Sequence, residues 1–453
     1  MQPYRLHVFA CDQKKPEGVP GCAARGSARV IEALRRELGK AGLGNEIQLT
    51  PCGSLGLCER GPNLVIYPEG VWYSGVTPDD VGEIVREHLQ NGRVVERLVN
   101  SDESAVRTEI EGNQKKRLAA LAAQDAAGML PDDFQQMVRG FQRSRVLLTA
   151  IELDVFSAVG EGARGDEVAS ILKSHPRATA MLLDALVALE ALTKQAGQYH
   201  NTPLSARYLS AGARDDARAA LMHTAHLWPR WSTLTECVQK GTAVTYREMT
   251  DRGDEWTEAF IAAMHRNASA RAPLVARAAG IERASRMLDV GGGSGAYSIA
   301  FARANPDLKA EVFDLPTVVP IAQRHIDEAG LAERVTTRVG NLRQDELGSG
   351  YDLILLSAIC HMLGPAGNQD LVQRCYRALA PGGRLIIQDF ILEPNRTSPT
   401  LAALFALNML VGTPDGGTYT SKEYRSWLEQ SGLIEVSHVR LPGPTGLMIG
   451  QHP

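Results

Sequence analysis

The chain has 453 residues, with 44% hydrophobic and 22% charged side chains and a formal net charge of −4. This length predicts about three domains, and the composition is typical of globular proteins that bury a hydrophobic core. The negative net charge argues against a nucleic-acid partner. No apolar run approaches the roughly 20 residues that span a bilayer, and the first residues lack the apolar core of a signal peptide. We therefore expect a cytoplasmic protein with no membrane or nucleic-acid partner.

Residues 1–98 are predicted to form one compact α/β unit. Short apolar runs bounded by turn residues predict its strands, and apolar residues at helical spacing predict its helices. The expected order is strand, helix, strand, strand and helix, over residues 6–10, 28–38, 63–67, 71–73 and 77–89.

Four of the seven cysteines lie in the first 58 residues, and they are Cys11, Cys22, Cys52 and Cys58. In a cytoplasmic protein such a local cluster indicates a metal or redox site rather than a set of disulfides. Four thiolates are the usual ligands of a 2Fe–2S cluster. A tetrahedral zinc site, or a domain that has lost its metal, would leave the same pattern.

The segment GLCERGPNLVIYPEGVWYSGVTPDDVGEIVREHL resembles the thioredoxin-like 2Fe–2S ferredoxins, and the resemblance covers most of this unit. It implies a thioredoxin-like fold with a cluster held by four cysteines. That family has a cysteine where this chain has Ser54. We expect Cys52 to take its place, because Gly53 gives the loop freedom to present it and serine is a much rarer iron ligand.

Residues 99–130 are rich in charged residues and alanine, and they are predicted to form a linker with some helix. Residues 131–245 are predicted to be mostly helical. A helix over 178–191 followed by the turn-rich segment 198–203 is typical of a winged helix, which can bind DNA. The helix at 178–191 contains no lysine or arginine and is apolar over most of its surface. We therefore expect it to be buried, in a dimer interface, rather than to bind DNA.

Residues 246–453 alternate strands and helices, as a doubly wound parallel sheet requires. Within them, Leu288–Gly295 reads LDVGGGSG, in which an apolar strand breaks into a glycine-rich turn before a helical pattern. Glycines let backbone N–H groups approach a ligand, and the start of the helix adds partial positive charge. Asp314 ends the next strand 21 residues after Gly293, which suits a ribose diol. These features predict a nucleotide-type cofactor.

The order of the glycines distinguishes two classes of cofactor. The turn lacks the G-x-G-x-x-G/A pattern of a dinucleotide site, because Ser298 stands where a third spaced glycine would fall. The acidic side chain of Asp289 would repel a pyrophosphate, but it is compatible with a cofactor that has none. It can pair with a cationic sulfonium or amino group. The turn therefore favours S-adenosylmethionine (SAM) over a dinucleotide. The remaining alternative is a glycine turn in an α/β domain that binds no ligand.

The second part of the chain resembles SAM-dependent O-methyltransferases of the caffeic-acid and hydroxyindole type, especially their bacterial relatives. The resemblance covers residues 131–453 and depends on an ordered series of motifs, which are LDVGGGSG, VFDLP, VGN, LLSAICH, LAPGGRLIIQDFILEP and LNMLVGTPDGGTYTSKEY. It implies a winged-helix-like dimerisation domain over 131–245, a Rossmann-like methyltransferase domain over 246–453, and a homodimer.

The resemblance implies a set of cofactor contacts. The glycine turn would approach the methionine part of SAM, Asp314 would bind both ribose hydroxyls, and the residues after the VG dipeptide would cover the adenine. The implied cofactor-binding residues are Asp289, Gly291, Gly293, Gly295, Asp314, Leu315, Asn341, Leu342 and Ser357. Asn341 stands where the family usually has an aspartate, and Ser357 stands where plant members have a lysine.

The resemblance also implies the acid–base groups and the acceptor pocket. His361 matches the general base of the family, and histidine can take a proton from a phenol or an alcohol near neutral pH. Asp389 matches a carboxylate that orients this histidine. Asn408 and Met409 are expected to line the acceptor pocket. A second carboxylate of the plant members falls at Thr418, so the pair of carboxylates is incomplete here.

The sequence therefore predicts a SAM-dependent O-methyltransferase that acts on a hydroxyl of a small, aromatic or polyketide-like acceptor. A fused ferredoxin domain would serve it by electron transfer with a redox partner protein, by redox sensing or by docking. Two other classes of function remain open. One is an electron-transfer protein whose SAM-binding half does not methylate, and the other is an enzyme for SAM-dependent decarboxylation or hydroxylation.

Overall fold

A computed structural model describes residues 4–15, 19–126, 128–247 and 253–453 of the chain. Contacts between residues divide it into two compact units, Met1–Phe141 and Gln142–Pro453. No helix in the described ranges has the length and hydrophobicity needed to cross a bilayer.

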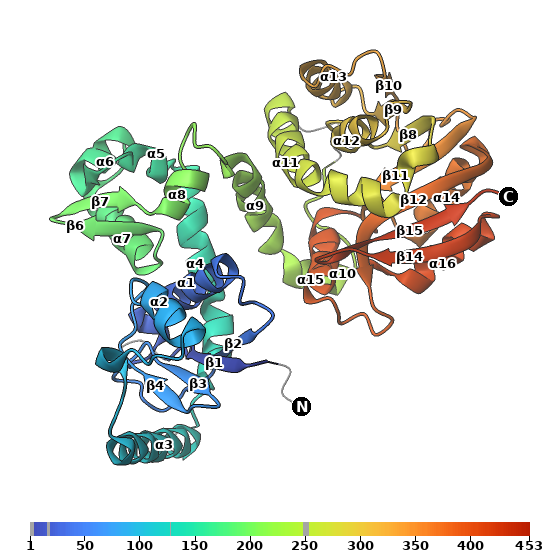
Figure 1. The fold of residues 1–453 in the computed structure, drawn as a ribbon. Helices are drawn as coiled ribbons and strands as arrows, with labels where there is room; N and C mark the ends of the chain where they lie inside the picture. Colours follow the sequence, from blue (N-terminus) through green and yellow to red (C-terminus); the bar gives the residue numbers. More distant parts are fainter. Residues whose placement is uncertain (1–3, 16–18, 127, 248–252) are drawn as a thin grey trace. The chain divides into compact units, whose positions relative to one another are not determined.

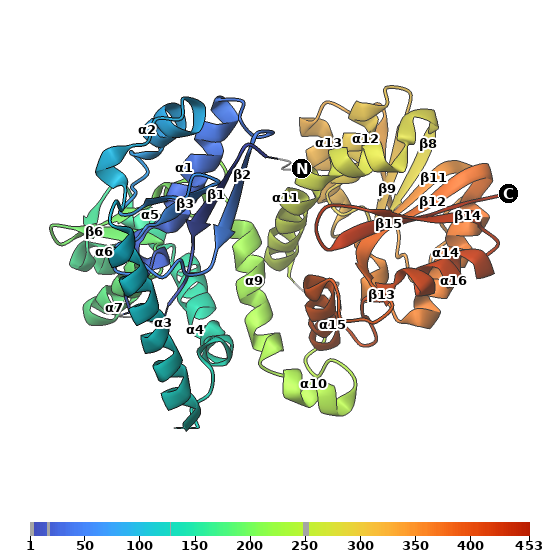
Figure 2. The ribbon, with the colours of Figure 1, turned by 60° about the horizontal axis from the view of Figure 1, so that its bottom comes forward.

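The first unit is built on a mixed sheet in the order β2-β1-β3-β4, of which Figure 2 labels the first three strands. Its strands are β1 (Leu6–Cys11), β2 (Ile47–Cys52), β3 (Leu64–Tyr67) and β4 (Val71–Tyr73). Strands β1 and β2 are parallel, and β3 is antiparallel to both of its neighbours. The helices are α1 (Ser27–Lys40) and α2 (Val81–Glu83), which continues as a π-helical segment (Ile84–Gln90), with short 3-10 turns at Ala23–Arg25 and Glu96–Leu98.

Two details of this unit differ from the sequence expectation. The sequence expectation lacks strand β2, although Ile47–Thr50 alternates apolar and polar residues, because this run is short and ends at Pro51. The last helix begins at Val81 rather than at residue 77. The reason is a local turn, in which the backbone N–H and the hydroxyl of Thr77 both donate to the side chain of Asp80, at 2.7 and 2.6 Å.

The segment predicted as a linker contains one long helix, α3 (Glu103–Ala126), that packs on the first unit. Asn113 donates its side-chain amide to the carbonyl oxygen of Gly56 at 2.7 Å, and Arg60 pairs with Glu109 at 2.7 Å. A β-carbon on Gly56 would lie 2.8 Å from the side chain of Ile110. The helix therefore covers the loop between Cys52 and Cys58.

The next region is helical with a small three-stranded sheet. Its helices are α4 (Asp132–Glu152), which crosses the division between the units, α5 (Val155–Val159), α6 (Gly165–Ile171), α7 (Pro176–Ala188), α8 (Pro203–Tyr208), α9 (Arg218–Trp231) and α10 (Leu234–Lys240). Strands β5 (Ala163–Arg164), β7 (Gln198–Asn201) and β6 (Leu192–Gln195) form the sheet in that order. Helix α7 buries Thr179, Leu183 and Leu186 and leaves Met181 60% exposed. Helix α7 contains no lysine and one arginine, at its second residue, so it has no basic face that could contact DNA.

The rest of the second unit is a large sheet in the order β10-β9-β8-β11-β12-β15-β14, with β13 beside β12. Its strands are β8 (Arg286–Val290), β9 (Lys309–Asp314), β10 (Val335–Val339), β11 (Tyr351–Ser357), β12 (Leu379–Leu392), β13 (Tyr419–Thr420), β14 (Ile434–Arg440) and β15 (Thr445–Gln451). The strands from β10 to β12 are parallel, and β15 and β14 complete the sheet in antiparallel fashion.

Helices cover both faces of this sheet (Figure 1). One buried cluster joins the sheet to α11 (Asp254–Ala279), α12 (Ala296–Ala304) and α13 (Val319–Glu328). A second cluster joins it to α14 (Pro365–Ala378) and α16 (Ser421–Gln430). Helix α15 (Thr400–Gly412) and the 3-10 turns at Ile281–Arg283 and Cys360–Met362 complete the region. This is the doubly wound, Rossmann-like arrangement that the alternating pattern predicted.

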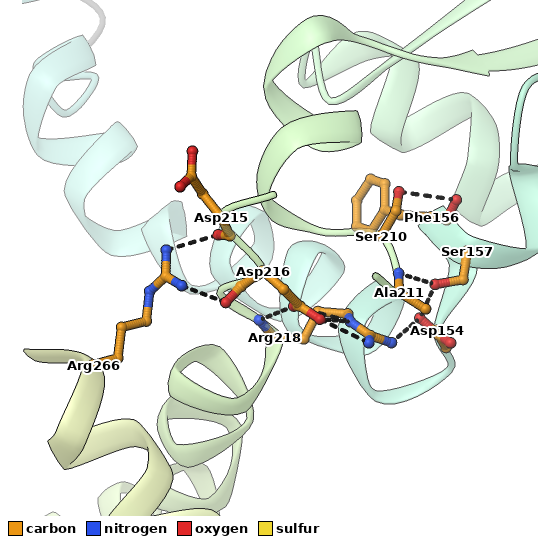
Figure 3. Close-up of polar contacts among 9 residues, drawn as sticks. All are labelled: Asp154, Phe156, Ser157, Ser210, Ala211, Asp215, Asp216, Arg218 and Arg266. Carbon is orange, nitrogen blue, oxygen red and sulfur yellow. Dashed lines mark hydrogen bonds and ion pairs between the residues drawn. The ribbon is translucent and has the colours of Figure 1, made fainter. Parts of the chain in front are cut away.

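Arg266 joins the helical region to the sheet region within the second unit, and Arg218 holds the segment that Arg266 contacts (Figure 3). Arg266 on α11 donates to the backbone carbonyl oxygens of Asp215 and Asp216, which precede α9. Arg218 in α9 pairs with the carboxylates of Asp154 and Asp216, each at 2.9 Å. Because guanidinium groups bind oxygen atoms with a rigid fork of donors, these contacts give the junction a defined geometry.

Candidate active site

The glycine turn follows β8 at the carboxyl edge of the parallel strands. Gly291 and Gly293 have φ values of +68° and +57°, in the region that favours glycine. A β-carbon on Gly291 would lie 2.4 Å from the side chain of Ile359, so this position has no room for a side chain. Among the described residues, a β-carbon on Gly293 would have one neighbour within 4 Å, the side chain of Ile261 at 3.9 Å. The space beside Gly293 is therefore open to a ligand, as a cofactor turn requires.

Asp289 lies directly behind this turn and is fully buried. Its Oδ2 accepts a hydrogen bond from the Ser298 hydroxyl at 2.7 Å, whereas its Oδ1 has no partner within the described part of the chain. Burial, opposed by the Ser298 hydrogen bond and aided by the Asp314 carboxylate, raises the pKa of Asp289 to about 7. A buried carboxylate with a free oxygen is well suited to a nearby positive charge.

Asp314 links the end of β9 to the turn. Its carboxylate accepts hydrogen bonds from the backbone N–H of Gly293 at 2.8 Å and of Leu315 at 2.7 Å. Burial raises the pKa of Asp314 despite these two donors. Leu315 packs beside Ile261, which also faces the turn. Each carboxylate oxygen has a further acceptor site, so Asp314 can still receive a ribose hydroxyl.

The residues expected near the adenine lie on the other side of the turn. The Leu342 side chain would be 3.2 Å from a β-carbon on Gly291, which places it against the turn. The Asn341 amide oxygen accepts from the backbone N–H of Arg343 at 2.9 Å. Part of the acceptor capacity of Asn341 is therefore used within its own loop.

His361 and Asp389 are brought together from the ends of β11 and β12. His361 Nδ1 lies 2.7 Å from Asp389 Oδ1, and the backbone N–H of His361 donates to Oδ2 of the same carboxylate at 3.1 Å. Asp389 also accepts from the backbone N–H of Phe390 at 2.8 Å and is fully buried. The carboxylate can only accept, so Nδ1 of a neutral His361 carries the proton and Nε2 is the free base.

Aromatic side chains surround this pair. Phe390 and Phe405 stack with ring centroids 4.0 Å apart, and His361 meets Phe405 edge-on at 4.9 Å. Asn408 on α15 accepts a hydrogen bond from the indole N–H of Trp231 at 3.0 Å. Met409 is buried. Phe405 and Trp231 were missed by the sequence reasoning, and the only signal for Phe405 was its place one turn before Asn408.

Thr418 does not replace the second carboxylate of the plant enzymes. Its hydroxyl donates to the carbonyl oxygen of Ala402 at 3.1 Å and is buried. It therefore serves the backbone of α15 rather than the imidazole of His361.

Cys11 has two other cysteines of the first unit as neighbours, Cys22 and Cys52. Cys11 and Cys22 are hydrogen-bonded, which lowers the pKa of Cys11 to about 6 and raises the pKa of Cys22. Cys52 lies opposite Cys11 in the register of β1 and β2, and burial raises its pKa to about 11. The Cys58 sulfur lies 3.2 Å from the Ser54 hydroxyl. Across the described residues, no three metal-binding side chains are close enough together to hold one ion.

Comparisons with known proteins agree with this picture of the second unit. The O-methyltransferase domain family matches residues 231–434, and the O-methyltransferase dimerisation domain family matches residues 135–211. A 3-hydroxy-5-methyl-1-naphthoate 3-O-methyltransferase of Streptomyces sahachiroi is 33% identical over 71% of this chain and 95% of its own length. The tetracenomycin polyketide synthesis 8-O-methyl transferase of Streptomyces glaucescens is 30% identical over 71% of this chain and 97% of its own length.

Solved structures show the same relationship. A putative O-methyltransferase from Nostoc punctiforme is 29% identical, with a TM-score of 0.64, over 71% of this chain and 99% of that one. Human N-acetylserotonin methyltransferase in complex with SAM is 25% identical, with a TM-score of 0.64, over 71% of this chain and 98% of that one. Neither the family matches nor these relatives support the predicted ferredoxin domain. The chain therefore belongs to the O-methyltransferase family, as a SAM-dependent enzyme with a helical dimerisation domain.

Proposed function

We propose that the enzyme transfers the methyl group of SAM to a hydroxyl of a small aromatic or polyketide-like molecule. The observation that carries this proposal is the His361–Asp389 pair, which presents a free Nε2 at the carboxyl edge of the sheet. The two Streptomyces relatives, whose names give a hydroxynaphthoate and a tetracenomycin polyketide, support the class of acceptor.

We assign the cofactor to the carboxyl edge of β8, β9 and β11. The open space at Gly293 and the free oxygen of Asp289 support this position, since one gives room and the other attracts positive charge. Asp314 would bind the ribose and Leu342 the adenine. The full set of proposed contacts is Asp289, Gly291, Gly293, Gly295, Asp314, Leu315, Asn341, Leu342 and Ser357.

His361 acts as the general base in this proposal. Its Nε2 takes the proton of the acceptor hydroxyl, and Asp389 stabilises the imidazolium that forms. Bound SAM supplies an electrophilic methyl group on a sulfonium sulfur. The acceptor oxygen bonds to the methyl carbon while the carbon–sulfur bond breaks, so the sulfur keeps that electron pair. The protein holds the reacting atoms in line, which accounts for much of the rate.

The side chains around His361 suit a flat acceptor. The stacked rings of Phe390 and Phe405 give one aromatic wall next to the base. Asn408 and Met409 extend from the same helix as Phe405, and we assign them to the acceptor pocket. The indole of Trp231 fixes the Asn408 amide by its hydrogen bond.

Incubation with SAM labelled on its methyl group and a panel of hydroxynaphthoates and polyketide phenols tests this function. We expect labelled methyl ethers, and no label on acceptors whose hydroxyls are already methylated. Carbon dioxide release or oxygen incorporation without methyl ethers would favour decarboxylation or hydroxylation instead. Binding of SAM with no product from any acceptor would favour a redox protein that does not methylate.

For the first unit we propose a thioredoxin-like ferredoxin domain with a 2Fe–2S cluster. The parallel β1-α1-β2 unit followed by the antiparallel β3-β4 hairpin and a helix supports the fold. Four thiols in one unit, three of them buried, are the usual donor set of such a cluster. They would have to move together to hold it, because no three metal-binding side chains of the described residues are close enough to share one ion. Cys11, Cys22, Cys52 and Cys58 would hold the cluster, with Ser54 outside it.

Anaerobic purification of the full chain tests the cluster. The protein should be brown, and Cys52→Ser should alter its visible spectrum whereas Ser54→Ala should not. The reverse result would make Ser54 the fourth ligand, and colourless protein with one zinc would exclude a ferredoxin. Methylation assays with the cluster oxidised and reduced would separate redox sensing from docking or from electron transfer with a partner protein.

A further inference from the structure

Gln388 is a buried polar residue beside the proposed catalytic pair, and neither the motifs nor the comparisons assign it a role. It lies on β12 in register with Ser357 of β11 and is only 4% exposed. Its Oε1 accepts a hydrogen bond from the Ser357 hydroxyl at 2.7 Å and from the Tyr297 hydroxyl at 3.3 Å. The side chain therefore joins the end of β11 to the first turn of α12.

These contacts fix the orientation of the amide. The 2.7 Å separation is typical of an O–H···O hydrogen bond and short for one in which nitrogen donates, so the oxygen faces Ser357. The amide nitrogen is then left without a hydrogen-bond partner among the residues that the structure describes. This nitrogen is not sealed off from solvent, so it is free to donate to a bound group that displaces water.

The position of this nitrogen indicates which group that is. Tyr297 follows Gly295 by two residues, and Ser357 ends the strand next to β8, so the amide lies at the edge where the glycine turn begins. Plant members of the family have a lysine at the position of Ser357. The glycine turn is expected to approach the methionine part of SAM, so in this proposal the amide of Gln388 lies beside that part.

We propose that Gln388 donates its amide N–H to the carboxylate of the methionine part of SAM, and that Ser357 and Tyr297 orient it for this contact. The inference rests on the proposed position of the cofactor. It adds a neutral donor in place of a cation, and a hydrogen bond to a charged group is stronger than one between neutral groups.

Calorimetric titration with two ligands tests the proposal. S-adenosylhomocysteine and 5′-methylthioadenosine are both thioethers, and they differ only in the amino-acid tail. Gln388→Met should weaken S-adenosylhomocysteine binding by about 10- to 100-fold, as expected for one hydrogen bond to a charged group. Gln388→Glu should weaken it further by charge repulsion. Binding of 5′-methylthioadenosine should stay within about twofold in both variants, which also shows that the fold is intact.

The controls separate this inference from the function on which it rests. Gln369→Met makes the same substitution at a glutamine whose amide donates to α16 on the opposite face of the sheet, and it should change neither affinity. Equal weakening of both ligands by Gln388→Met, or tighter S-adenosylhomocysteine binding by Gln388→Glu, would overturn the role of Gln388. Failure of the unmodified enzyme to bind S-adenosylhomocysteine would instead refute the proposed cofactor position.

Discussion

Asp289→Asn should stabilise the cofactor-free protein by an amount that depends on pH. Asp289 has an ordinary pKa of 3.8 in the unfolded chain and about 7 in the fold, where burial is the main cause. A raised carboxyl pKa means that its contribution to stability is fully present below pH 3.8 and is lost as pH rises through 7. The full loss is about 4 kcal/mol, at about 1.4 kcal/mol for each pKa unit.

The pH range from 5 to 8 covers most of this loss. The stability of Asp289→Asn relative to the natural protein should rise by about 2–3 kcal/mol across it, or about 4 °C in melting temperature for a unit of this size. Asparagine still accepts from Ser298, but its buried NH₂ group adds an offset that does not change with pH. The test therefore uses the slope, against pH, of the difference in stability between the variant and the natural protein. The size of this difference at a single pH is not informative.

Thermal unfolding of both proteins at several pH values, without SAM, measures this slope. Asp307→Asn, at an exposed aspartate of the same unit, is the matched control and should run parallel to the natural protein. If the melting temperature of Asp289→Asn also ran parallel to that of the natural protein, the reasoning would be refuted. Asp289 would then have the same pKa in the folded and the unfolded chain. The same variant should bind SAM more weakly, since the carboxylate behind the turn loses its charge.

Three other results follow from the site, and a fourth follows from the dimerisation domain. Gly291→Ala should abolish SAM binding in calorimetry, because its β-carbon would come 2.4 Å from Ile359 and φ is +68°; undiminished binding would remove the turn from the cofactor site. His361→Ala should lower turnover by about 10²–10⁴ while SAM affinity changes little, and full activity from pH 6 to 9 would mean that another group is the base. Asp389→Asn should lower turnover with unchanged SAM affinity, because Nδ1 loses the carboxylate that selects its tautomer. Light scattering should give about twice the 49.0 kDa of one chain, with no salt-sensitive binding of duplex DNA, and a monomeric mass would contradict the homodimer.

The sequence by itself determined the features that depend on local chain conformation. The LDVGGGSG motif indicated a strand, a tight turn and a helix, because glycine adopts the positive φ values of this turn without steric cost. The alternation of apolar strands and helices indicated the doubly wound sheet, and the motif order indicated the family and the roles expected of His361 and Asp389. These inferences need no knowledge of which distant side chains meet.

Only the tertiary structure decided the contacts between residues far apart in the chain. His361 Nδ1 meets the carboxylate of Asp389, 28 residues away, and so leaves Nε2 as the base. Residues 103–126 form a helix that packs on the first unit, although their composition resembles a linker. The hydroxyl of Thr418 serves a backbone carbonyl, and the amide of Gln388 is held between two hydroxyls from separate elements. Local composition cannot specify such pairs, because they form only when β11, β12, α12 and α15 pack around one edge of the sheet.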